Sequence, residues 1–184
     1  MTESNASRFR RLSEETIAEW RYWKLVRASF VAPDGEQFVR GYVTSPAAVA
    51  VVAVSRGEVA MIRQFRPSLN DVFWEIPAGM RDVADEEPIV AARRELAEEV
   101  GAHGGRWRQL ASTIQAPGLS NAEMTIFFAD GVERGQSEPD GPEERAMTVH
   151  WLPVEEVMTM VDEGSVVNAT AVVGLLAAAR NGWR

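Results

Sequence analysis

The sequence predicts an α/β protein in which helices cover a mixed β-sheet. Three observations support this class. Apolar or alternating runs typical of strands occur in both halves of the chain, one segment has a helix pattern bounded by proline and glycine, and the two kinds of segment alternate irregularly. Irregular alternation indicates a mixed sheet with helices packed against it.

Most strands are predicted from short apolar or alternating runs. Two of these runs flank a tight turn at Ser55-Arg56-Gly57 and predict a hairpin, and Pro33-Asp34-Gly35 predicts another turn. The expected strands span 37–44, 47–54, 58–65, 107–115, 124–129 and 148–152. Residues 1–13 predict a frayed start or an arm, 14–28 have a mixed pattern, and 131–144 predict an acidic loop rich in glycine and proline.

Three helices are expected. The first spans 88–100, because Pro88 occupies its first position and Gly101 follows its end. Two further helices are predicted over 154–161 and 169–180, with Asn168 as the N-cap of the last.

The composition limits the classes of protein that the chain can belong to. Its 184 residues are 46% apolar and 25% charged, which is ordinary for a globular protein. The absence of cysteine excludes disulfides, thiolate metal sites and a cysteine nucleophile. Neither a signal peptide nor an apolar run of the ~20 residues that a membrane span needs is visible, so we expect a cytoplasmic protein.

The net charge of −8 argues against nucleic acid or a membrane surface as the partner. It does not exclude an anionic small molecule, because clustered arginines or a bound cation can reverse the sign of the potential within a pocket.

Acidic side chains gather along one side of the helix predicted over 88–100. Glu95 and Glu99 are four residues apart, which places their Cβ atoms ~5–6 Å from each other, and Glu98 lies beside them. Like charges at this spacing destabilise a helix by ~0.2–0.5 kcal/mol. A divalent cation that prefers oxygen ligands, such as Mg²⁺, would offset the repulsion. The alternative is a solvated acidic face that Arg93 and Arg94 partly compensate.

The segment 79–102 resembles the Nudix box, whose pattern is Gly, five residues, Glu, seven residues, then Arg-Glu-apolar-any-Glu-Glu-any-Gly-apolar. The first gap here holds six residues instead of five, which predicts one extra residue in the loop before the helix. This resemblance implies a Nudix-type α/β/α sandwich. The matching residues are Gly79, Glu86, Arg94, Glu95, Leu96, Glu98, Glu99, Gly101 and Ala102.

The resemblance implies a site that holds Mg²⁺, or Mn²⁺ as the alternative, against a nucleoside diphosphate. Carried over to this sequence, Glu95 and Glu99 are metal ligands, Glu98 is a ligand or holds a metal-bound water, and the carbonyl of Ala78 completes the site. Arg94 orients the glutamates. Metals in such a site neutralise the diphosphate, activate water and stabilise the leaving oxygen.

Sequences outside the box are similar to the ADP-ribose pyrophosphatase branch of the family. The similarity lies in Ile-Arg-Gln-Phe-Arg at 62–66, in the approach to the box at 73–79, and in Pro117, fifteen residues after Ala102. It implies metal-dependent hydrolysis of ADP-ribose to AMP and ribose 5-phosphate, with Pro117 in the substrate-selecting loop.

Further site residues are implied by the same similarity. Arg66 matches a phosphate-binding arginine and Glu75 matches an acid beside the metal. Arg63 is either a second phosphate ligand or a surface charge, and Arg40 is a weaker candidate from a partner subunit.

The general base is expected just ahead of the last strand. Glu143 and Glu144 both occupy this stretch, and the sequence does not choose between them. A solvated loop without a catalytic role is the alternative.

The resemblance also implies a homodimer. Residues 1–45 are expected to form an arm and strands used for dimerisation, and 46–184 the Nudix domain. Trp20 and Trp23 are apolar enough to need burial, either in the core, in a dimer interface or, for Trp23, against an adenine.

Two other functions stay open at this point. One is the same reaction on nucleotide sugars or dinucleotides. The other is a non-catalytic module that senses ADP-ribose, which the intact glutamates of the box disfavour.

Overall fold

The computed structural model describes residues 8–138 and 141–183. Contacts between Cα atoms divide it into two compact units. The first contains the chain up to residue 46 together with 114–123, and the second contains 47–113 and 124 onwards. The sequence placed a boundary at 45/46 but gave no sign that 114–123 belongs with the N-terminal part.

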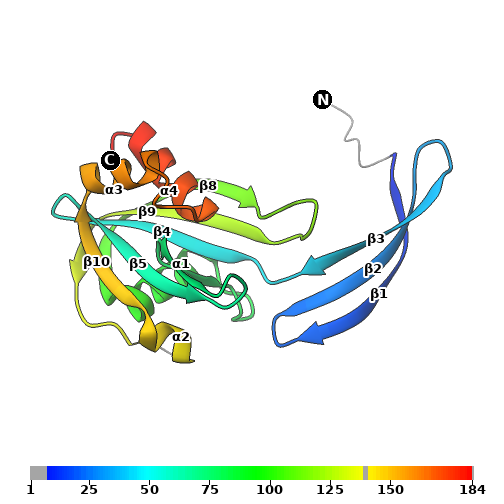
Figure 1. Cartoon of the computed structure of the whole chain (residues 1–184), viewed down its shortest axis with the longest axis horizontal. Helices are drawn as coiled ribbons and strands as arrows, with labels where there is room; N and C mark the ends of the chain where they lie inside the picture. Colours follow the sequence, from blue (N-terminus) through cyan, green and yellow to red (C-terminus); the bar gives the residue numbers. More distant parts are fainter. Residues whose placement is uncertain (1–7, 139–140, 184) are drawn as a thin grey trace. The chain divides into compact units, whose positions relative to one another are not determined.

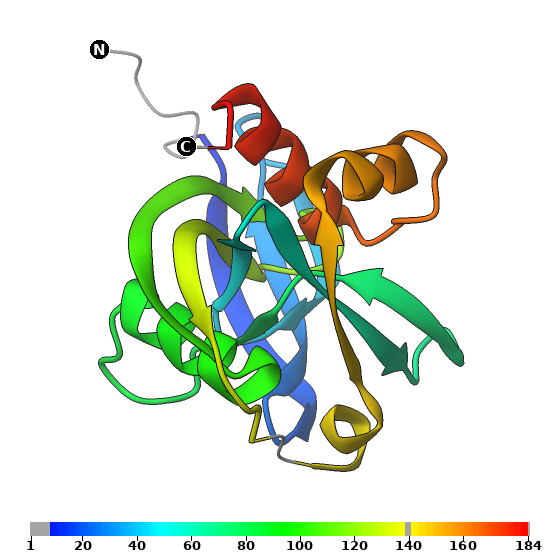
Figure 2. The ribbon, with the colours of Figure 1, turned by 90° about the vertical axis from the view of Figure 1, so that its left-hand side faces the viewer.

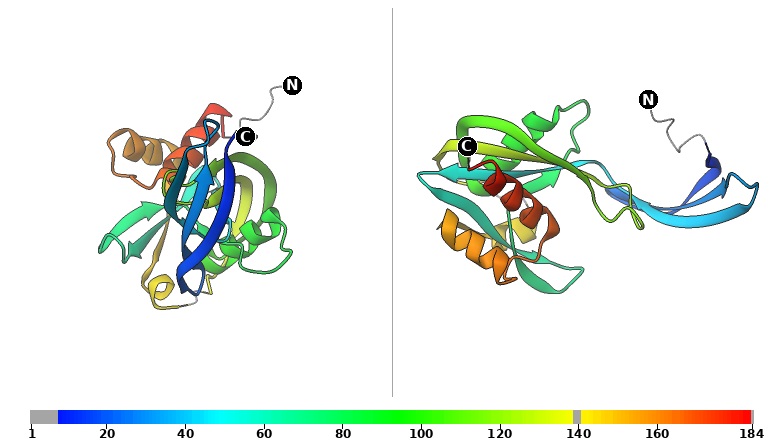
Figure 3. Two further views of the ribbon diagram at one scale, coloured as in Figure 1. Left: turned by 90° about the vertical axis from the view of Figure 1, so that its right-hand side faces the viewer. Right: turned by 90° about the horizontal axis from the view of Figure 1, so that it is seen from above.

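The first unit is built on a three-stranded antiparallel sheet in the order β1-β2-β3. Its strands are β1 (Arg10–Trp20), β2 (Trp23–Val31) and β3 (Gln37–Thr44), which lie side by side in Figure 3. The prediction of a strand over 37–44 is confirmed. The alternative of a frayed start through residue 13 is wrong, because β1 already begins at Arg10; residues 1–7 lie outside the described residues.

Segment 114–123 is joined to the end of β3 by backbone hydrogen bonds. The amide of Val43 donates to the carbonyl of Leu119 at 2.9 Å, and the amide of Asn121 donates to the carbonyl of Val43 at 3.2 Å. These bonds explain why this segment groups with the N-terminal strands.

Trp20 and Trp23 face each other across the β1–β2 turn. Trp20 is 58% exposed and Trp23 is 45% exposed. Of the alternatives for these two side chains, burial in the core of this chain is therefore wrong.

A mixed sheet forms the centre of the second unit (Figure 1). Its path is β10-β5-β4-β9-β8, with β6 paired to β5 and β7 paired to β4. β4 and β9 are parallel, whereas β4–β5, β4–β7, β5–β6 and β5–β10 are antiparallel, so the predicted mixed sheet is confirmed. The strands are β4 (Ala48–Ser55), β5 (Glu58–Arg66), β6 (Asp71–Glu75), β7 (Ala78–Met80), β8 (Ala102–Ile114), β9 (Glu123–Arg134) and β10 (Thr148–Pro153).

The β4–β5 hairpin opens away from its turn. Arg56 and Gly57 both have positive φ, 55° and 81°, as a tight hairpin turn requires. The two strands pair with each other only beside this turn, and further along β5 pairs with β6 while β4 pairs with β7. The β6–β7 connection therefore enters the sheet where β4 and β5 diverge, and the amide of Val51 donates to the carbonyl of Pro77 at 2.9 Å.

Helices cover both faces of this sheet, which confirms the predicted sandwich (Figure 2). Along β4, Val49 and Val51 pack toward α1 (Pro88–Glu95) and η2 (Leu96–Val100). The alternate residues Ala50 and Val52 pack toward α3 (Val154–Asp162) and α4 (Ala169–Arg180). Since both faces of β4 are buried, its sequence is a continuous apolar run.

The three predicted helices are present, with one difference in geometry. The helix expected over 88–100 has this extent, but its last five residues form the π-helix η2. Asn168 caps α4 as predicted, since its side chain accepts a hydrogen bond from the amide of Ala171 at 3.0 Å.

The predicted loop over 131–144 is wrong at both of its ends. β9 continues to Arg134, whose guanidinium donates to the carbonyl of Ser55 at 2.9 Å and pairs with Glu58. Near the other end, α2 (Gly141–Ala146) is a short helix with no buried residue, so it has no apolar face that a sequence pattern could reveal.

Within residues 8–138 and 141–183, none of the helices is long and apolar enough to span a membrane.

Gly101 ends η2 with φ of 70°. A Cβ at this position would lie 2.3 Å from the carbonyl carbon of Gln136 and 2.6 Å from the amide nitrogen of Ser137. We expect Gly101→Ala to lower the free energy of unfolding by more than ~2 kcal/mol, measured by urea denaturation, because a backbone clash adds to the strain of a left-handed alanine.

Gly131 provides the matched control. It has the same φ of 70°, but a Cβ there would meet no atom within 4 Å. Gly131→Ala should cost only the ~1–2 kcal/mol of left-handed strain, and equal losses for the two variants would contradict the clash.

Candidate active site

The three box glutamates lie at the junction of α1 and η2 but differ in their exposure. Glu95 ends α1, and Glu98 and Glu99 lie in η2. The side chain of Glu98 is 45% exposed and that of Glu95 only 11%, while Glu99 is buried. A solvated acidic face therefore does not describe Glu95 and Glu99.

The π-helix is a feature that the sequence did not indicate. π-helical turns are rare and occur frequently at functional sites. Here the widened turn contains Glu98 and Glu99, directly after Glu95. The sequence of these five residues is equally compatible with an ordinary α-helix, so it contains no signal for the π-helical turn.

The β6–β7 connection and β7 hold the two buried carboxylates. The backbone amide of Ala78 donates to Oε2 of Glu99 at 2.8 Å. At Gly79 a Cβ would lie 2.0–2.3 Å from the carboxylate atoms of Glu95, so any other residue here would displace this carboxylate from its position. The glycine that begins the box is thus explained by the position of Glu95.

Burial raises the pKa values of both carboxyl groups. It brings the pKa of Glu95 to about 7, although the charge and hydrogen bond of Arg94 lower it. Burial likewise raises the pKa of Glu99 to about 8, against the lowering effect of the Ala78 amide, and the charge of Glu95 adds to the rise. Both acids thus hold their protons to a higher pH than an exposed glutamate does.

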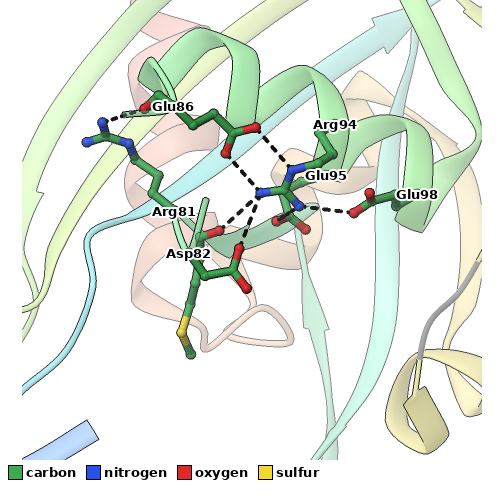
Figure 4. A network of polar contacts seen from close by, with 7 residues as sticks. Arg81, Asp82, Glu86, Arg94, Glu95 and Glu98 are labelled. Atoms are coloured by element: carbon green, nitrogen blue, oxygen red, sulfur yellow. Dashed lines mark hydrogen bonds and ion pairs between the residues drawn. The ribbon is translucent and has the colours of Figure 1, made fainter. Parts of the chain in front are cut away.

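Arg94 connects the acids of the box into one network (Figure 4). Its Nη1 donates to Glu95 at 2.7 Å and to Glu98 at 3.1 Å. Its Nε and Nη2 donate to the two oxygens of Glu86 at 3.2 and 3.1 Å, and these hydrogen bonds are the main reason that the pKa of Arg94 is raised. This geometry agrees with the expected role of Arg94 in orienting the glutamates.

The extra residue before the helix is accommodated within the loop. Asp85 adopts φ of 59°, an uncommon conformation for a residue other than glycine. Glu86 nevertheless reaches Arg94, and its carbonyl accepts a hydrogen bond from Arg81 at 2.7 Å. The longer loop therefore leaves the contact between Glu86 and Arg94 in place.

Arg66 and Glu75 form a two-pronged ion pair beside the carboxylates. Nε and Nη2 of Arg66 donate to the two oxygens of Glu75 at 2.8 and 2.5 Å. The Glu75 side chain is 4% exposed and that of Arg66 is 40% exposed. The hydrogen bonds to Glu75 raise the pKa of Arg66, and the charges of Glu99 and Glu143 add to this. Glu75 thus holds Arg66 through Nε and Nη2, and this ion pair does not use Nη1.

Arg63 lies on the opposite side of β5. Alternate residues of this strand face opposite sides of the sheet, and Ile62 packs toward α1 whereas Met61 packs toward α3 and α4. The guanidinium of Arg63 lies 5.1 Å from the ring centre of Trp74, which packs with the α3–α4 cluster. The structure therefore brings Arg66, but not Arg63, to the side of the box glutamates.

The two candidates for the general base lie on α2. Glu143 is exposed and Glu144 is half-buried. The charge of Glu144 raises the pKa values of both Glu95 and Glu99, whereas the charge of Glu143 acts on Arg66. Glu144 is thus the residue whose carboxylate is electrostatically coupled to the box acids.

Three predicted substrate residues belong to the first unit, and their assignment stays a prediction. Arg40 on β3 is engaged locally, with Nη1 2.8 Å from the carbonyl of Val39 and its guanidinium over the ring of Phe38 at 4.8 Å. Trp23 and Pro117 are the other two.

The donor atoms at this site suit a hard divalent cation. Carboxylate and carbonyl oxygens are the ligands that Mg²⁺ prefers, and a cation bound to Glu95 and Glu99 would stabilise the ionised forms that burial disfavours. In the described part of the chain, however, no three acidic or histidine side chains are gathered closely enough to hold an ion. Arg94 binds Glu95 and Glu98 here, so these bonds would have to lengthen for an ion to enter.

The raised pKa values predict how stability depends on pH without a divalent cation. The folded chain binds more protons than the unfolded chain above the ordinary glutamate pKa of about 4.3, so this contribution is lost as pH rises through about 7 and 8. We expect the free energy of unfolding in EDTA to fall from about pH 5 to about pH 8 and then to level off, by at most ~1.4 kcal/mol per pH unit and group.

Urea denaturation at several pH values measures this slope. The variant with Glu95→Gln and Glu99→Gln should give a flatter profile, and a wild-type profile that is flat or rising would contradict the burial of these acids.

The sheet, the helices on both of its faces and the box geometry define a known class of protein. Residues 43–170 match the family model described as the NUDIX domain, which is more than half of the chain. The chain belongs to the Nudix family.

Two relatives show which members of the Nudix family this chain is similar to. The chain is 36% identical over 171 residues to an ADP-ribose pyrophosphatase of Mycobacterium tuberculosis (strain ATCC 25618 / H37Rv), covering 92% of this chain and 82% of the relative. It is 29% identical over 164 residues to an ADP-ribose pyrophosphatase of Bacillus subtilis (strain 168), covering 86% and 88%. These findings confirm the predicted family and the prediction of a Nudix pyrophosphatase enzyme.

A solved structure described as an ADP compounds hydrolase has the same fold. It superposes with a TM-score of 0.83 over 96% of each chain at 23% identity.

Proposed function

We propose that this enzyme hydrolyses the diphosphate bond of ADP-ribose to AMP and ribose 5-phosphate, with Mg²⁺ as cofactor and Mn²⁺ as the alternative. The observation that supports this best is the buried pair Glu95 and Glu99, fitted against Gly79 and the amide of Ala78. Similarity to relatives named as ADP-ribose pyrophosphatases supports the substrate.

Glu95, Glu98 and Glu99, with the carbonyl of Ala78, are the groups that would hold the cation. A bound divalent cation supplies charge neutralisation of the diphosphate and lowers the pKa of water. In the reaction, water adds to one phosphorus, and the bridging oxygen leaves with the other phosphate.

The protein side chains supply positioning and proton transfer. Glu144 accepts the proton from the attacking water, since its charge acts on the same two acids that would hold the cation. Arg66, fixed by Glu75, binds a phosphate oxygen through its remaining guanidinium nitrogen. Arg94 keeps Glu95 and Glu98 oriented.

The first unit is proposed to contribute to dimerisation and to substrate binding. Its sheet exposes apolar side chains, which favours burial against a second copy of this chain. Trp23, Arg40 and Pro117 are the proposed substrate contacts, and the cytoplasm is the proposed location. The exposed large apolar residues of the strands in this unit are Leu12, Ile17, Trp20, Trp23, Leu25 and Val39.

A substrate panel tests the proposed function. Purified enzyme with Mg²⁺ is given ADP-ribose, nucleotide sugars, dinucleotides and oxidised triphosphates, and the products are separated by chromatography. We expect AMP and ribose 5-phosphate to form fastest, at a rate that EDTA abolishes and added Mg²⁺ restores.

Two results would change the assignment. Faster hydrolysis of a nucleotide sugar or a dinucleotide would replace the substrate while keeping the reaction. Tight binding of ADP-ribose by calorimetry, without turnover at any metal concentration, would establish the sensing module instead.

A further inference from the structure

Gln64 is a buried side chain with an unpaired oxygen on the same strand as Arg66. The residue is 8% exposed, and its Oε1 finds no hydrogen-bond partner among residues 8–138 and 141–183. A buried acceptor without a donor destabilises a folded protein, and such groups are rare in native structures. An apolar side chain would fill this position at lower free energy, so the amide needs a reason other than folding.

Gln64 faces the side of the sheet on which the box glutamates lie. It comes two residues after Ile62, which packs toward α1, and two residues before Arg66. Across the β5–β6 pair, Glu75 lies opposite Ile62 and Asp71 lies opposite Arg66. Arg66 and Glu75 thus lie on either side of Gln64 along the strands, and the ion pair that joins them passes beside Gln64.

The other flank of Gln64 borders α2. Pairing of β10 with β5 begins at Thr148, opposite Arg63, and so stops one residue short of Gln64. The chain before Thr148 is α2, which packs against β5. Gln64 thus lies between the ion pair that presents Arg66 and the helix that contains Glu144.

The chemistry of the unpaired atom restricts what it can bind. A carboxamide oxygen only accepts hydrogen bonds, and so do the oxygens of an ionised diphosphate. A donor that comes with the substrate can therefore supply the missing hydrogen bond. Three sources of O–H groups have this property in the proposed reaction, namely the terminal ribose, the adenosine ribose and a water molecule on the diphosphate.

We propose that Gln64 is a further substrate-contacting residue, whose carboxamide oxygen accepts a hydrogen bond from an O–H group that enters the site with the nucleoside diphosphate. This inference rests on the proposed function. It also accounts for a buried polar group that the folded chain leaves without a donor.

The variant Gln64→Met tests the proposal, because methionine has a similar length and no hydrogen-bonding group. Kinetic constants are measured with ADP-ribose and with the methyl ester of ADP on its β-phosphate, which lacks the terminal ribose. Gln109→Met, at an exposed glutamine of β8 that bonds to Ser112, is the matched control and should keep wild-type constants.

The three sources of the O–H group give different kinetics. If a hydroxyl of the terminal ribose donates, KM for ADP-ribose rises about tenfold and the constants for the methyl ester stay unchanged. If a hydroxyl of the adenosine ribose donates, KM rises about tenfold for both substrates. If a water molecule donates, kcat falls about tenfold with both substrates. In each case the midpoint of thermal unfolding stays the same or rises, because an unpaired buried acceptor has been removed.

Three results would overturn the proposal. Constants within twofold of wild type for both substrates would show that the oxygen makes no contact in the reaction. A fall of several degrees in the unfolding midpoint would show that it has a partner within the protein. Failure of the wild-type enzyme to hydrolyse any diphosphate would refute the proposed function as well, and so is distinguishable from the other two.

Discussion

Glu99→Gln should lower kcat by about 10³-fold or more while the protein stays folded. A metal ion stabilises the charge of the transition state by several kcal/mol, and each 1.36 kcal/mol corresponds to a factor of ten. Glutamine still accepts the hydrogen bond from the amide of Ala78 but lacks the negative charge of a metal ligand. Because the carboxyl group is buried with a pKa of about 8, its neutral replacement should not destabilise the chain.

Turnover of ADP-ribose at saturating Mg²⁺, together with urea denaturation, measures both parts of this prediction. Glu156→Gln, at an exposed position of α3, is the matched control. Wild-type turnover in Glu99→Gln with metal present would end the assignment of this residue as a ligand.

Glu144→Gln should lower kcat by about 10²–10⁴-fold, the range for loss of a positioned general base. Glu143→Gln should lose much less, since the Glu143 carboxylate is exposed and acts on Arg66 rather than on Glu95 and Glu99. The two variants remove the same charge from neighbouring positions of α2, so their difference isolates the role of position.

The pH profile gives a second measure of the base. The acidic limb of kcat against pH, which reports ionisation of the base, should be lost in Glu144→Gln and kept in Glu143→Gln. A larger loss in Glu143→Gln would assign the base to that residue instead.

The core strands and the three main helices could be predicted because burial leaves a pattern in the sequence. β4 is buried on both faces and is therefore a continuous apolar run, and Asn168 caps α4 with its side chain. β1 could not be predicted, since almost all of its residues are exposed and no apolar alternation marks it. Its turn to β2, at Arg21 and Tyr22, also lacks the glycine or asparagine typical of a two-residue hairpin.

For the site, the spacing of the box predicts which residues form it, but it does not predict how their side chains are arranged in space. The burial of Glu95 against Gly79 and the face of β5 occupied by Arg63 depend on packing between distant segments. The π-helical turn has no signature in the sequence. The preference for Glu144 over Glu143 also required the position of α2, whose short exposed helix has no apolar face.

Segment 114–123 has a consequence for how this architecture can vary in evolution. Because it groups with the N-terminal strands, the backbone passes between the two units at three places rather than one. A gene fusion that replaced residues up to 46 would leave Leu119 and Asn121 without their bonds to Val43. The N-terminal sheet is therefore expected to be inherited together with the β8–β9 connection, and chimeras that exchange both should express better than chimeras that exchange either alone.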